Sequence, residues 1–289
     1  MKIDLEDCLK KVAEEGLVVC VFSNKEYTPI LSFFNMYFSS AVKRKYLVIA
    51  LDKETYYYCD KKNYCTYYSP FTEPFGVDFM QHQMEVIKKI LTLNYNVLVS
   101  DIDAIWLKDP IPYTLSSSSD IVFSPGTIQP LEAFEKWGNV LCSGYFLLMA
   151  NERVLRFLES VKKRMIYEGD QPAINKELIS RNLIWKNDTE LYKQVFRRKK
   201  IIQSKETRIG IADNISVALL PNRFFQRLEE KEDPLVFHPI APKICVDKME
   251  VFKKNGFLLK LPIRIKNRYK KFLIIENLIK KLKKKILNT

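Results

Sequence analysis

The segment Asn-Val-Leu-Val-Ser-Asp-Ile-Asp-Ala-Ile-Trp-Leu-Lys-Asp-Pro at residues 96–110 decides the fold that we predict for this chain. Residues 97–100 are a short, almost unbroken apolar run, which is typical of a strand buried on both faces. Alternate residues of an extended segment point the same way, so Asp101 and Asp103 are expected to project together from the C-terminal end of this strand. Open α/β sheets bind their ligands at that end.

The two neighbouring carboxylates indicate a cation site. They repel each other and are costly to desolvate unless a positive charge lies between them, and a divalent cation bridged to a diphosphate supplies that charge. The alternative is an Asp-x-Asp that occurs by chance and caps a turn. The position directly after a buried strand, with Trp106 and Asp109-Pro110 following, favours the functional interpretation.

Residues 93–110 resemble the signature of the nucleotide-diphospho-sugar transferase family, glycosyltransferases of the GT-A fold whose pattern contains Ser-Asp-x-Asp-x-x-Trp-Leu-x-Asp-Pro. The family usually has Gly where this chain has Asn94, and Asn is able to adopt the same left-handed turn position. The resemblance implies an α/β fold of GT-A type, with a Rossmann-like, mostly parallel central sheet flanked by helices. We expect residues 1–262 to form this single domain and residues 263–289 to form a basic amphipathic C-terminal helix.

The order of elements before this segment also predicts a doubly wound parallel sheet. Residues 17–22 and 46–51 are apolar runs of strand length, separated by an aromatic-rich helix at residues 29–42. Loops after such strands line the ligand crevice. The candidates for contacts with the donor base, which the resemblance also implies, are Phe22, Ser23 and Asn24. The alternative for each of them is an ordinary turn in which Ser or Asn caps the next helix.

A helix predicted at residues 79–93 leads directly into the carboxylate strand. In the family, a Lys near the start of this helix often reaches the donor phosphates, whereas this chain has Gln81-His82-Gln83 there. The lysine's role therefore has no matching residue, and we expect Gln83 to contact the donor through hydrogen bonds. His82 is predicted to be an ordinary surface residue of the helix.

After residue 110 we expect a loop, a short strand at 120–125, a variable loop at 126–138 that shapes acceptor specificity, and a buried strand at 140–149. Ser143 and Gly144 interrupt the last of these, and a Gly within a strand marks a bulge or a close approach of ligand to backbone. Residues 142–145 resemble the family's Asn-Thr-Gly-Phe. Although the Asn is missing, Ser143 and Gly144 are expected beside the donor sugar.

An amphipathic helix at residues 151–167 precedes Asp170, which by spacing is a helix N-cap with Pro172 in the first turn. The family's Asp-Gln-x-x-x-Asn motif matches Asp170, Gln171 and Asn175. The resemblance implies that Asp170 is the catalytic carboxylate and that Gln171 contacts the donor. Asp170 would orient or deprotonate the acceptor hydroxyl in an inverting enzyme, or stabilise the cationic sugar in a retaining one.

The remaining segments carry one further candidate site. Residues 55–75 are predicted as weakly patterned strand and loop, and the charged residues 176–212 as a solvated hairpin or loop. Residues 217–225 resemble a late strand and turn of the family. A further apolar strand ends at His238, and the resemblance implies that His238 completes the metal site and that Lys243 binds the diphosphate. A lone histidine is more often structural, and imidazole suits Mn2+ better than Mg2+.

Bulk properties limit the class of protein. At 289 residues with 47% hydrophobic residues, the chain is long enough to bury a large core, and no apolar run is long enough to cross a membrane. The six cysteines form no Cys-x-x-Cys pair, so reduced core thiols are expected. The acidic N-terminus lacks the apolar stretch of a signal peptide, which leads us to expect a cytoplasmic protein.

The net charge of +13 lies mainly in residues 264–289, where ten Lys or Arg residues accompany one acid. Apolar residues recur there at helical spacing, which predicts an amphipathic helix. This helix either lies on an anionic membrane surface, binds a partner, or packs as a solvated helix on the body. Nucleic acid is not expected as a partner, because no recognition motif accompanies the charge.

We therefore expect a glycosyltransferase, either a hexosyl- or a pentosyltransferase, that moves a sugar from a UDP-sugar donor to a hydroxyl of a glycan or glycoconjugate. Asp101, Asp103 and His238 are the expected ligands of Mn2+ or Mg2+, and Asp101 also contacts the donor. One alternative is a metal-dependent nucleotidyl- or phosphotransferase, which would act on triphosphates. The other is a non-catalytic basic adaptor for membranes or nucleic acid, which would keep its binding after Asp103→Ala.

Overall fold

The computed structural model describes residues 4–71, 76–186, 191–196, 199–227, 234–240, 245–254 and 256–257. The chain divides into two units, Met1–Pro239 and Ile240–Thr289. The second unit contains helix α9 (Cys245–Lys254), and the expected basic helix from residue 263 onward lies outside the described residues. The domain boundary that we expected at residue 262 stays a prediction.

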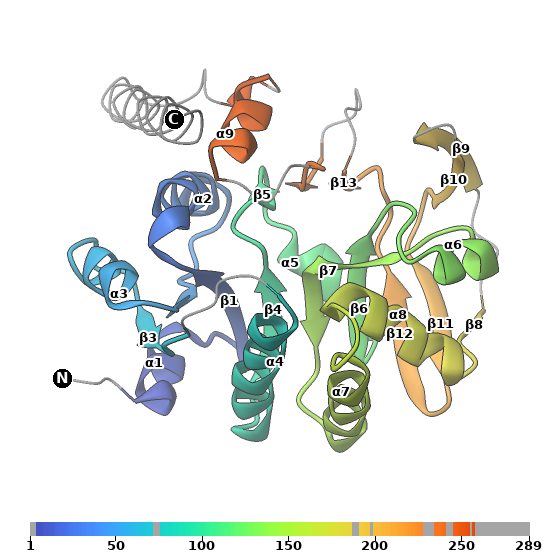
Figure 1. Cartoon of the computed structure of the whole chain (residues 1–289), viewed down its shortest axis with the longest axis horizontal. Helices are drawn as coiled ribbons and strands as arrows, with labels where there is room; N and C mark the ends of the chain where they lie inside the picture. Colours follow the sequence, from blue (N-terminus) through green and yellow to red (C-terminus); the bar gives the residue numbers. More distant parts are fainter. Residues whose placement is uncertain are drawn as a thin grey trace, which may run out of the picture. The chain divides into compact units, whose positions relative to one another are not determined.

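The first unit is built on a nine-stranded sheet in the order β3-β2-β1-β4-β7-β6-β12-β11-β8 (Figure 1). Its strands are β1 (Leu17–Ser23), β2 (Leu47–Ala50), β3 (Thr66–Tyr68), β4 (Asn96–Ser100), β6 (Ile121–Pro125), β7 (Leu141–Leu148), β8 (Ile184–Trp185), β11 (Arg208–Ala212) and β12 (Ile215–Leu219). Strands β7 and β11 run opposite to the other seven. The predicted α/β class with a mostly parallel central sheet is confirmed.

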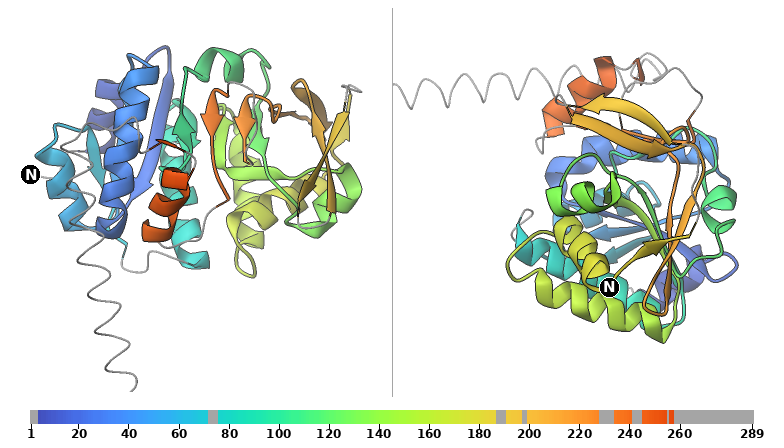
Figure 2. Two further views of the ribbon diagram at one scale, coloured as in Figure 1. Left: turned by 90° about the horizontal axis from the view of Figure 1, so that it is seen from above. Right: turned by 90° about the vertical axis from the view of Figure 1, so that its right-hand side faces the viewer.

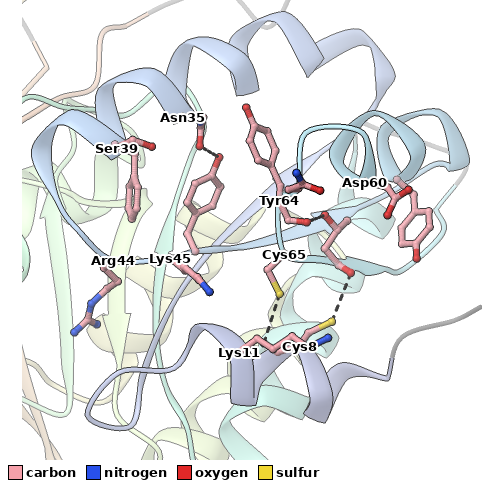
Figure 3. A pocket seen from close by; sticks show the side chains of 14 residues that line it. Cys8, Lys11, Asn35, Ser39, Arg44, Lys45, Asp60, Tyr64 and Cys65 are labelled. Atoms are coloured by element: carbon pink, nitrogen blue, oxygen red, sulfur yellow. Dashed lines mark hydrogen bonds between the residues drawn. The ribbon is translucent and has the colours of Figure 1, made fainter.

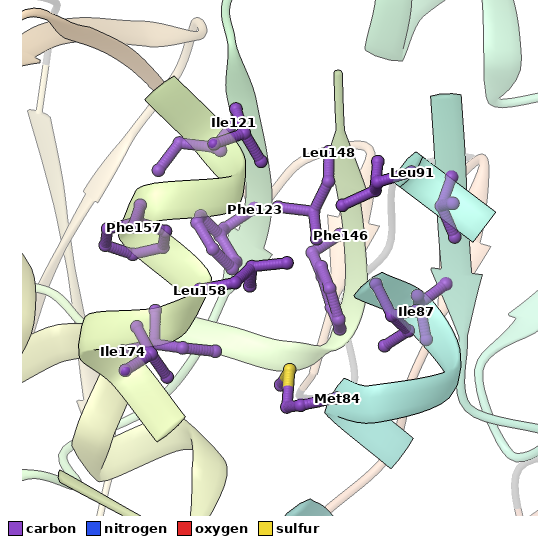
Figure 4. Close-up of a cluster of buried hydrophobic side chains, with 14 of the residues drawn as sticks. Met84, Ile87, Leu91, Ile121, Phe123, Phe146, Leu148, Phe157, Leu158 and Ile174 are labelled. Carbon is purple, nitrogen blue, oxygen red and sulfur yellow. The ribbon is translucent and has the colours of Figure 1, made fainter. Parts of the chain in front are cut away.

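Helices cover both faces of this sheet (Figures 1 and 2). They are α1 (Leu5–Val12), α2 (Thr28–Ala41), α3 (Lys53–Asp60), α4 (Val77–Thr92), α5 (Ile111–Leu115), α6 (Leu131–Trp137), α7 (Glu152–Arg164) and α8 (Asp170–Ser180). Figure 4 shows the core on one face, where side chains of α4, α7 and α8 pack on β6 and β7. Burial of these apolar side chains is the main force that holds the layers together.

Two small β-structures accompany the main sheet. Strands β5 (Ile105–Trp106), β14 (Val236–Phe237) and β13 (Phe225–Gln226) form a three-stranded sheet in the order β13-β14-β5. Strands β9 (Leu191–Phe196) and β10 (Lys199–Ser204) pair as an antiparallel hairpin. A hairpin therefore lies within residues 176–212, which were predicted as a solvated hairpin or loop. The same stretch also contains the end of α8 and the strands β8 and β11 of the main sheet, which the charge pattern concealed.

Three predicted loops contain helices. Residues 53–60 form α3, in which Asp52 caps the N-terminus by accepting from Thr55 N at 2.7 Å and the buried Thr55 and Cys59 lie at helical spacing. The predicted loop at residues 126–138 contains α6, which ends at Gly138 in the left-handed conformation with φ 72°. The loop after residue 110 contains α5. Aromatic and proline residues obscured the helical period in all three.

The cysteines and histidines of the first unit are largely buried. Cys8, Cys20, Cys59 and Cys142 are buried, Cys65 is half-buried, and all five are free thiols, as predicted. His82 was expected on the surface, but its Nε2 lies 2.9 Å from Ser69 Oγ and its ring stacks on Phe71, because the end of β3 packs against α4. In the part of the chain that the structure describes, no helix is long and apolar enough to cross a membrane.

Candidate functional site

The carboxylates of Asp101 and Asp103 meet through a tight turn at the end of β4. The backbone N–H of Ala104 donates to Asp101 O at 3.0 Å, so the chain turns where strand alternation was expected. The side chain of Asp101 is 49% exposed, whereas that of Asp103 is 5% exposed. The two residues converge as predicted, but one faces solvent and the other faces the interior.

Trp106 anchors this turn from the apolar side. Its indole is fully buried and Nε1 donates to Ser100 Oγ at 3.1 Å, which ties the end of the turn to its beginning. The ring packs 4.8 Å from Phe38 and 5.8 Å from Tyr145, centroid to centroid. An indole buried with its N–H satisfied is a rigid support, so the turn that carries the carboxylates is fixed from below.

His238 completes a three-residue cluster. Its Nε2 lies 3.4 Å from Asp103 Oδ1 and 3.6 Å from Asp101 Oδ2, and one ligand atom from each residue lies within 4.8 Å of the others. The pairing of β14 with β5 brings His238 here, because Phe237 pairs with Ile105. Within the described residues, this is the cluster of three such side chains close enough to share a metal ion.

A bulge in β7 makes room for the imidazole. The register between β6 and β7 shifts between Phe123 and Ser124, so the segment around Gly144 is looped out of the ladder. A Cβ added to Gly144 would overlap the ring of His238 and lie 2.7 Å from Asp101 Oδ2. The predicted bulge at Ser143 and Gly144 is confirmed, and the group that approaches the glycine is a side chain of the site.

Arg227 and Cys142 also contact His238. Arg227 Nη1 lies 2.6 Å from His238 Nδ1 and 3.1 Å from Cys142 Sγ. Burial and Arg227 lower the pKa of His238. Asp103 and Cys142 raise it by more than that, so the pKa lies above its ordinary value. Burial raises the pKa of Cys142, but Arg227 and His238 bring it below its ordinary value. Neither Arg227 nor Cys142 was predicted as a site residue.

The donor set of the cluster fits a divalent cation. Two carboxylates supply the hard oxygen ligands that Mn2+ and Mg2+ prefer, and an imidazole nitrogen is compatible with Mn2+. The missing Cβ at Gly144 leaves the cradle in which His238 approaches Asp101. Asp101, Asp103 and His238 could therefore hold such an ion, and the identity of the ion stays a prediction.

The N-terminus of α8 is fastened to the same bulge. Gln171 Oε1 accepts from Ser143 N at 3.4 Å, and Gln171 Nε2 donates to Gln129 O at 2.7 Å. Asp170 is the first residue of α8 and Gly169 occupies the N-cap position, so the predicted N-cap role of Asp170 is wrong by one residue. The Asp170 carboxylate still accepts from Gln171 N at 2.7 Å, which orients it at the helix start.

A cavity of about 680 Å3 opens where β1 and β2 end, and it is lined by Asn24, Asp52, Tyr57, Tyr68 and Phe71 among others. Asn24 caps the short 3-10 helix Lys25–Tyr27 by accepting from Tyr27 N at 3.2 Å. Ser23 is buried and donates to Asn24 O, and Phe22 packs against the core. Of the three residues predicted at the donor base, Asn24 alone is among the lining residues of this cavity.

Two further candidates stay predictions. Gln83 lies in the second turn of α4 and is half-buried. Lys243 lies outside the described residues. The structure therefore describes the positions of the three candidate metal ligands and the contacts of α8. It does not describe the lysine that was predicted to bind phosphate.

A second cavity of about 440 Å3 lies at the opposite ends of the strands, where β2 and β3 begin (Figure 3). Lys11 and Cys8 of α1 line it together with Lys45 and Cys65. A hydrogen bond with Cys8, together with the charges of Lys11 and Lys45, lowers the pKa of Cys65 against the opposing effect of burial. None of the predicted site residues is among its lining residues.

Comparisons with known proteins show what this chain is similar to. The family described as nucleotide-diphospho-sugar transferase matches residues 41–238. Among curated proteins of Arabidopsis thaliana, the chain is 26% identical over 185 residues to beta-arabinofuranosyltransferase RAY1, covering 59% of this chain and 34% of the relative. It is 32% identical over 137 residues to a UDP-D-xylose:L-fucose alpha-1,3-D-xylosyltransferase, covering 42% of this chain and 36% of the relative. The chain thus spans about a third of the length of these relatives.

A comparison with solved structures gives the galactosyltransferase LgtC in complex with donor and acceptor sugar analogs. The identity is 12%, the TM-score is 0.48, and the match covers 86% of this chain and 99% of that structure.

Proposed function

This chain belongs to the nucleotide-diphospho-sugar transferase family, and from that membership we propose that it transfers a sugar from a nucleotide-diphosphate donor to a hydroxyl group of a glycan or glycoconjugate. The observation that carries the proposal is the cluster of Asp101, Asp103 and His238, assembled from the end of β4 and the end of β14. Both ends of this cluster fall inside the matched region at residues 41–238.

The proposed donor is a UDP-sugar, and a UDP-pentose is the first candidate. The support is that relatives 26% and 32% identical to this chain are named as an arabinofuranosyltransferase and a UDP-xylose-dependent xylosyltransferase. The cavity beside Asn24 has the size of a nucleoside site and aromatic residues in its lining, which suits stacking on a base. The acceptor hydroxyl would approach from the side of Asp170.

In the proposed reaction, separate groups of residues bind the cation, position the donor sugar and act on the acceptor. Asp101, Asp103 and His238 hold the divalent cation, and the cation when bound neutralises charge on the leaving diphosphate. Ser143, Gly144 and Gln171, which lie together at the bulge, position the donor sugar. Asp170, held by its own helix start, orients or deprotonates the acceptor in an inverting reaction, or stabilises the cationic sugar in a retaining one.

Calorimetric titration of UDP and GDP, with and without Mn2+, tests the proposal. The wild-type chain should bind UDP more tightly with Mn2+, and Asp103→Ala should lose the metal-dependent part. Asp60→Ala is the matched control, because Asp60 is an exposed acid outside the site. Binding of triphosphates in preference to UDP would indicate a nucleotidyl- or phosphotransferase. Failure of both nucleotides to bind in the presence of Mn2+ would refute the assignment.

A further inference from the structure

Arg227 contacts the candidate metal ligand His238 on both ring nitrogens. Its Nη1 lies 2.6 Å from Nδ1 and 3.4 Å from Nε2, and it also lies 3.1 Å from Cys142 Sγ. A guanidinium has N–H donors and no acceptor, so the histidine and the thiol must be the acceptors. The Nε of Arg227 is buried and has no hydrogen-bond partner in the described part of the chain. Arg227 therefore meets the site through one nitrogen.

This contact is incompatible with a metal ion on His238. A neutral imidazole has one lone pair and one N–H. A cation on Nδ1 would take the lone pair that accepts from Arg227. The other nitrogen, Nε2, lies 3.4 Å from Asp103 Oδ1. A cation on Nε2 would leave the ring proton on Nδ1, and this N–H would then face the N–H donor of Arg227. Arg227 must leave His238 whichever nitrogen the metal takes.

The charges lead to the same conclusion. In the absence of a cation, the guanidinium beside His238 offsets part of the negative charge of Asp101 and Asp103. A divalent cation between those carboxylates repels Arg227, and a partly buried site screens that repulsion less than water does. The planar fork of a guanidinium suits phosphate oxygens. A donor diphosphate bridged to the cation would give the displaced side chain a new partner.

We infer that Arg227 is a donor-binding residue that stands in for the metal ion at His238 and moves onto the donor diphosphate when metal and donor bind. This inference rests on the proposed function. Metal alone must displace Arg227 without offering it a partner, whereas metal and nucleotide together offer one. Mn2+ and UDP should therefore bind cooperatively, and each should raise the affinity of the other by the same factor.

The test measures Mn2+ binding to the full chain by electron paramagnetic resonance of the free ion, with and without UDP. Arg227→Met removes the charge at similar length, and Arg227→Gln is a second neutral variant in case the first fails to fold. Arg208→Met is the matched control, because β11 is separated from β7 by β6 and β12. The folded state of each variant is checked by thermal unfolding.

We expect Arg227→Met and Arg227→Gln to bind Mn2+ alone about tenfold more tightly than wild type, and UDP to add less to that affinity. In the presence of Mn2+, both variants should bind UDP more weakly while their affinity for uridine is unchanged. Arg208→Met should match wild type in every titration. These results together would establish the double role of Arg227.

Two outcomes would count against the inference, and they differ. If wild type binds both Mn2+ and UDP but folded Arg227 variants bind Mn2+ alone no more tightly than wild type, the inference is wrong and the proposed function stands. If wild type binds neither, the proposed function fails and the inference fails with it.

Discussion

The side-chain amide of Asn175 pairs with both backbone groups of Leu141. Its Oδ1 accepts from Leu141 N at 3.0 Å and its Nδ2 donates to Leu141 O at 2.8 Å. The Nδ2 group also donates to Gln171 O at 2.8 Å within α8. Asn175 is completely buried, so none of these groups has water as an alternative partner. This pair fastens the helix that carries Asp170 to the strand whose bulge carries Gly144.

Asn175→Ala should therefore destabilise the fold. It leaves the N–H and the C=O of Leu141 unpaired in the interior, and each unpaired buried group costs about 1–3 kcal/mol. We expect the free energy of unfolding to fall by about 2–4 kcal/mol in urea denaturation. Thr92→Ala, which removes an exposed hydroxyl that donates to Lys88 O, is the control and should stay within about 0.5 kcal/mol of wild type. Equal stability of the two variants would contradict the structure.

Gly144→Ala should disrupt the metal site while the sheet remains folded. The added Cβ would overlap the ring of His238 and lie 2.7 Å from Asp101 Oδ2, so one of the two ligands must move. Displacement of Asp101 or His238 from its position in the site should weaken Mn2+ binding at least about tenfold in calorimetry. Gly16→Ala is the control, since its φ of 72° makes the variant strained but its Cβ meets nothing within 4 Å. That control should lose about 1 kcal/mol of stability and keep its metal affinity.

Asp120 should make stability depend on pH in the acid range. Its carboxylate accepts from Ser216 N, Arg153 and Asn151. Burial raises the pKa of Asp120. These hydrogen bonds lower it by more than burial raises it, so the pKa in the folded state lies below the ordinary value. The stabilisation is therefore present above about pH 4 and is lost as the pH falls through the folded pKa.

The measurement compares wild type with Asp120→Asn in urea denaturation at several pH values. We expect the variant to be about 1–3 kcal/mol less stable at pH 7, and this difference should shrink below about pH 4. Asp60→Asn is an exposed control and should change stability by less than about 0.5 kcal/mol. A difference for Asp120→Asn that grows toward acid pH would show that the sign is wrong.

Asp170→Asn should lower turnover without lowering donor affinity. If the carboxylate works on the acceptor or on the reacting sugar, its loss should slow Mn2+-dependent hydrolysis of UDP-xylose about 10²–10⁴-fold. The affinity for UDP, measured by calorimetry, should stay unchanged, because the three candidate metal ligands are not altered. Glu168→Gln is the matched control, since Glu168 is an acid two residues before Asp170 and its carboxylate pairs with Lys176 of α8 at 2.6 Å. Equal turnover of Asp170→Asn and wild type would remove Asp170 from the proposed chemistry.

Strongly apolar elements were predictable from the sequence, and aromatic or charged ones were not. Strands β1, β2 and β4 follow from uninterrupted apolar runs, and β7 follows from an apolar run that Ser143 and Gly144 interrupt. The left-handed turn at Asn94 was expected and has φ 63°. Helices α3 and α6 were missed because each buries only two residues, Thr55 and Cys59 in α3 and Ala133 and Trp137 in α6, which is too few to show a helical period. Strand β11 was missed because its short segment lies in a stretch rich in charged residues, which resembled a solvated loop.

Some residues of the candidate site were predictable from a local sequence pattern, and others were not. Asp101 and Asp103 are adjacent in sequence, and His238 ends an apolar strand, so a local pattern marks each of them. Arg227 has no such pattern, because its role depends on the pairing of β13 with β14, which short-range spacing does not encode. The donor role of Lys243 came from the resemblance, and that of Gln83 was expected where the family's Lys has no match, and both remain predictions.

The pairing of β5 with β14 joins a segment in the first half of this chain to one near the end of its first unit. A nascent chain that has left the ribosome only as far as β12 has both aspartates but no histidine to close the cluster. Completion of the proposed cation site therefore requires that synthesis has passed residue 238 and that the last strand has docked. A metal titration of purified chain would thus also report the fraction of molecules that have finished folding.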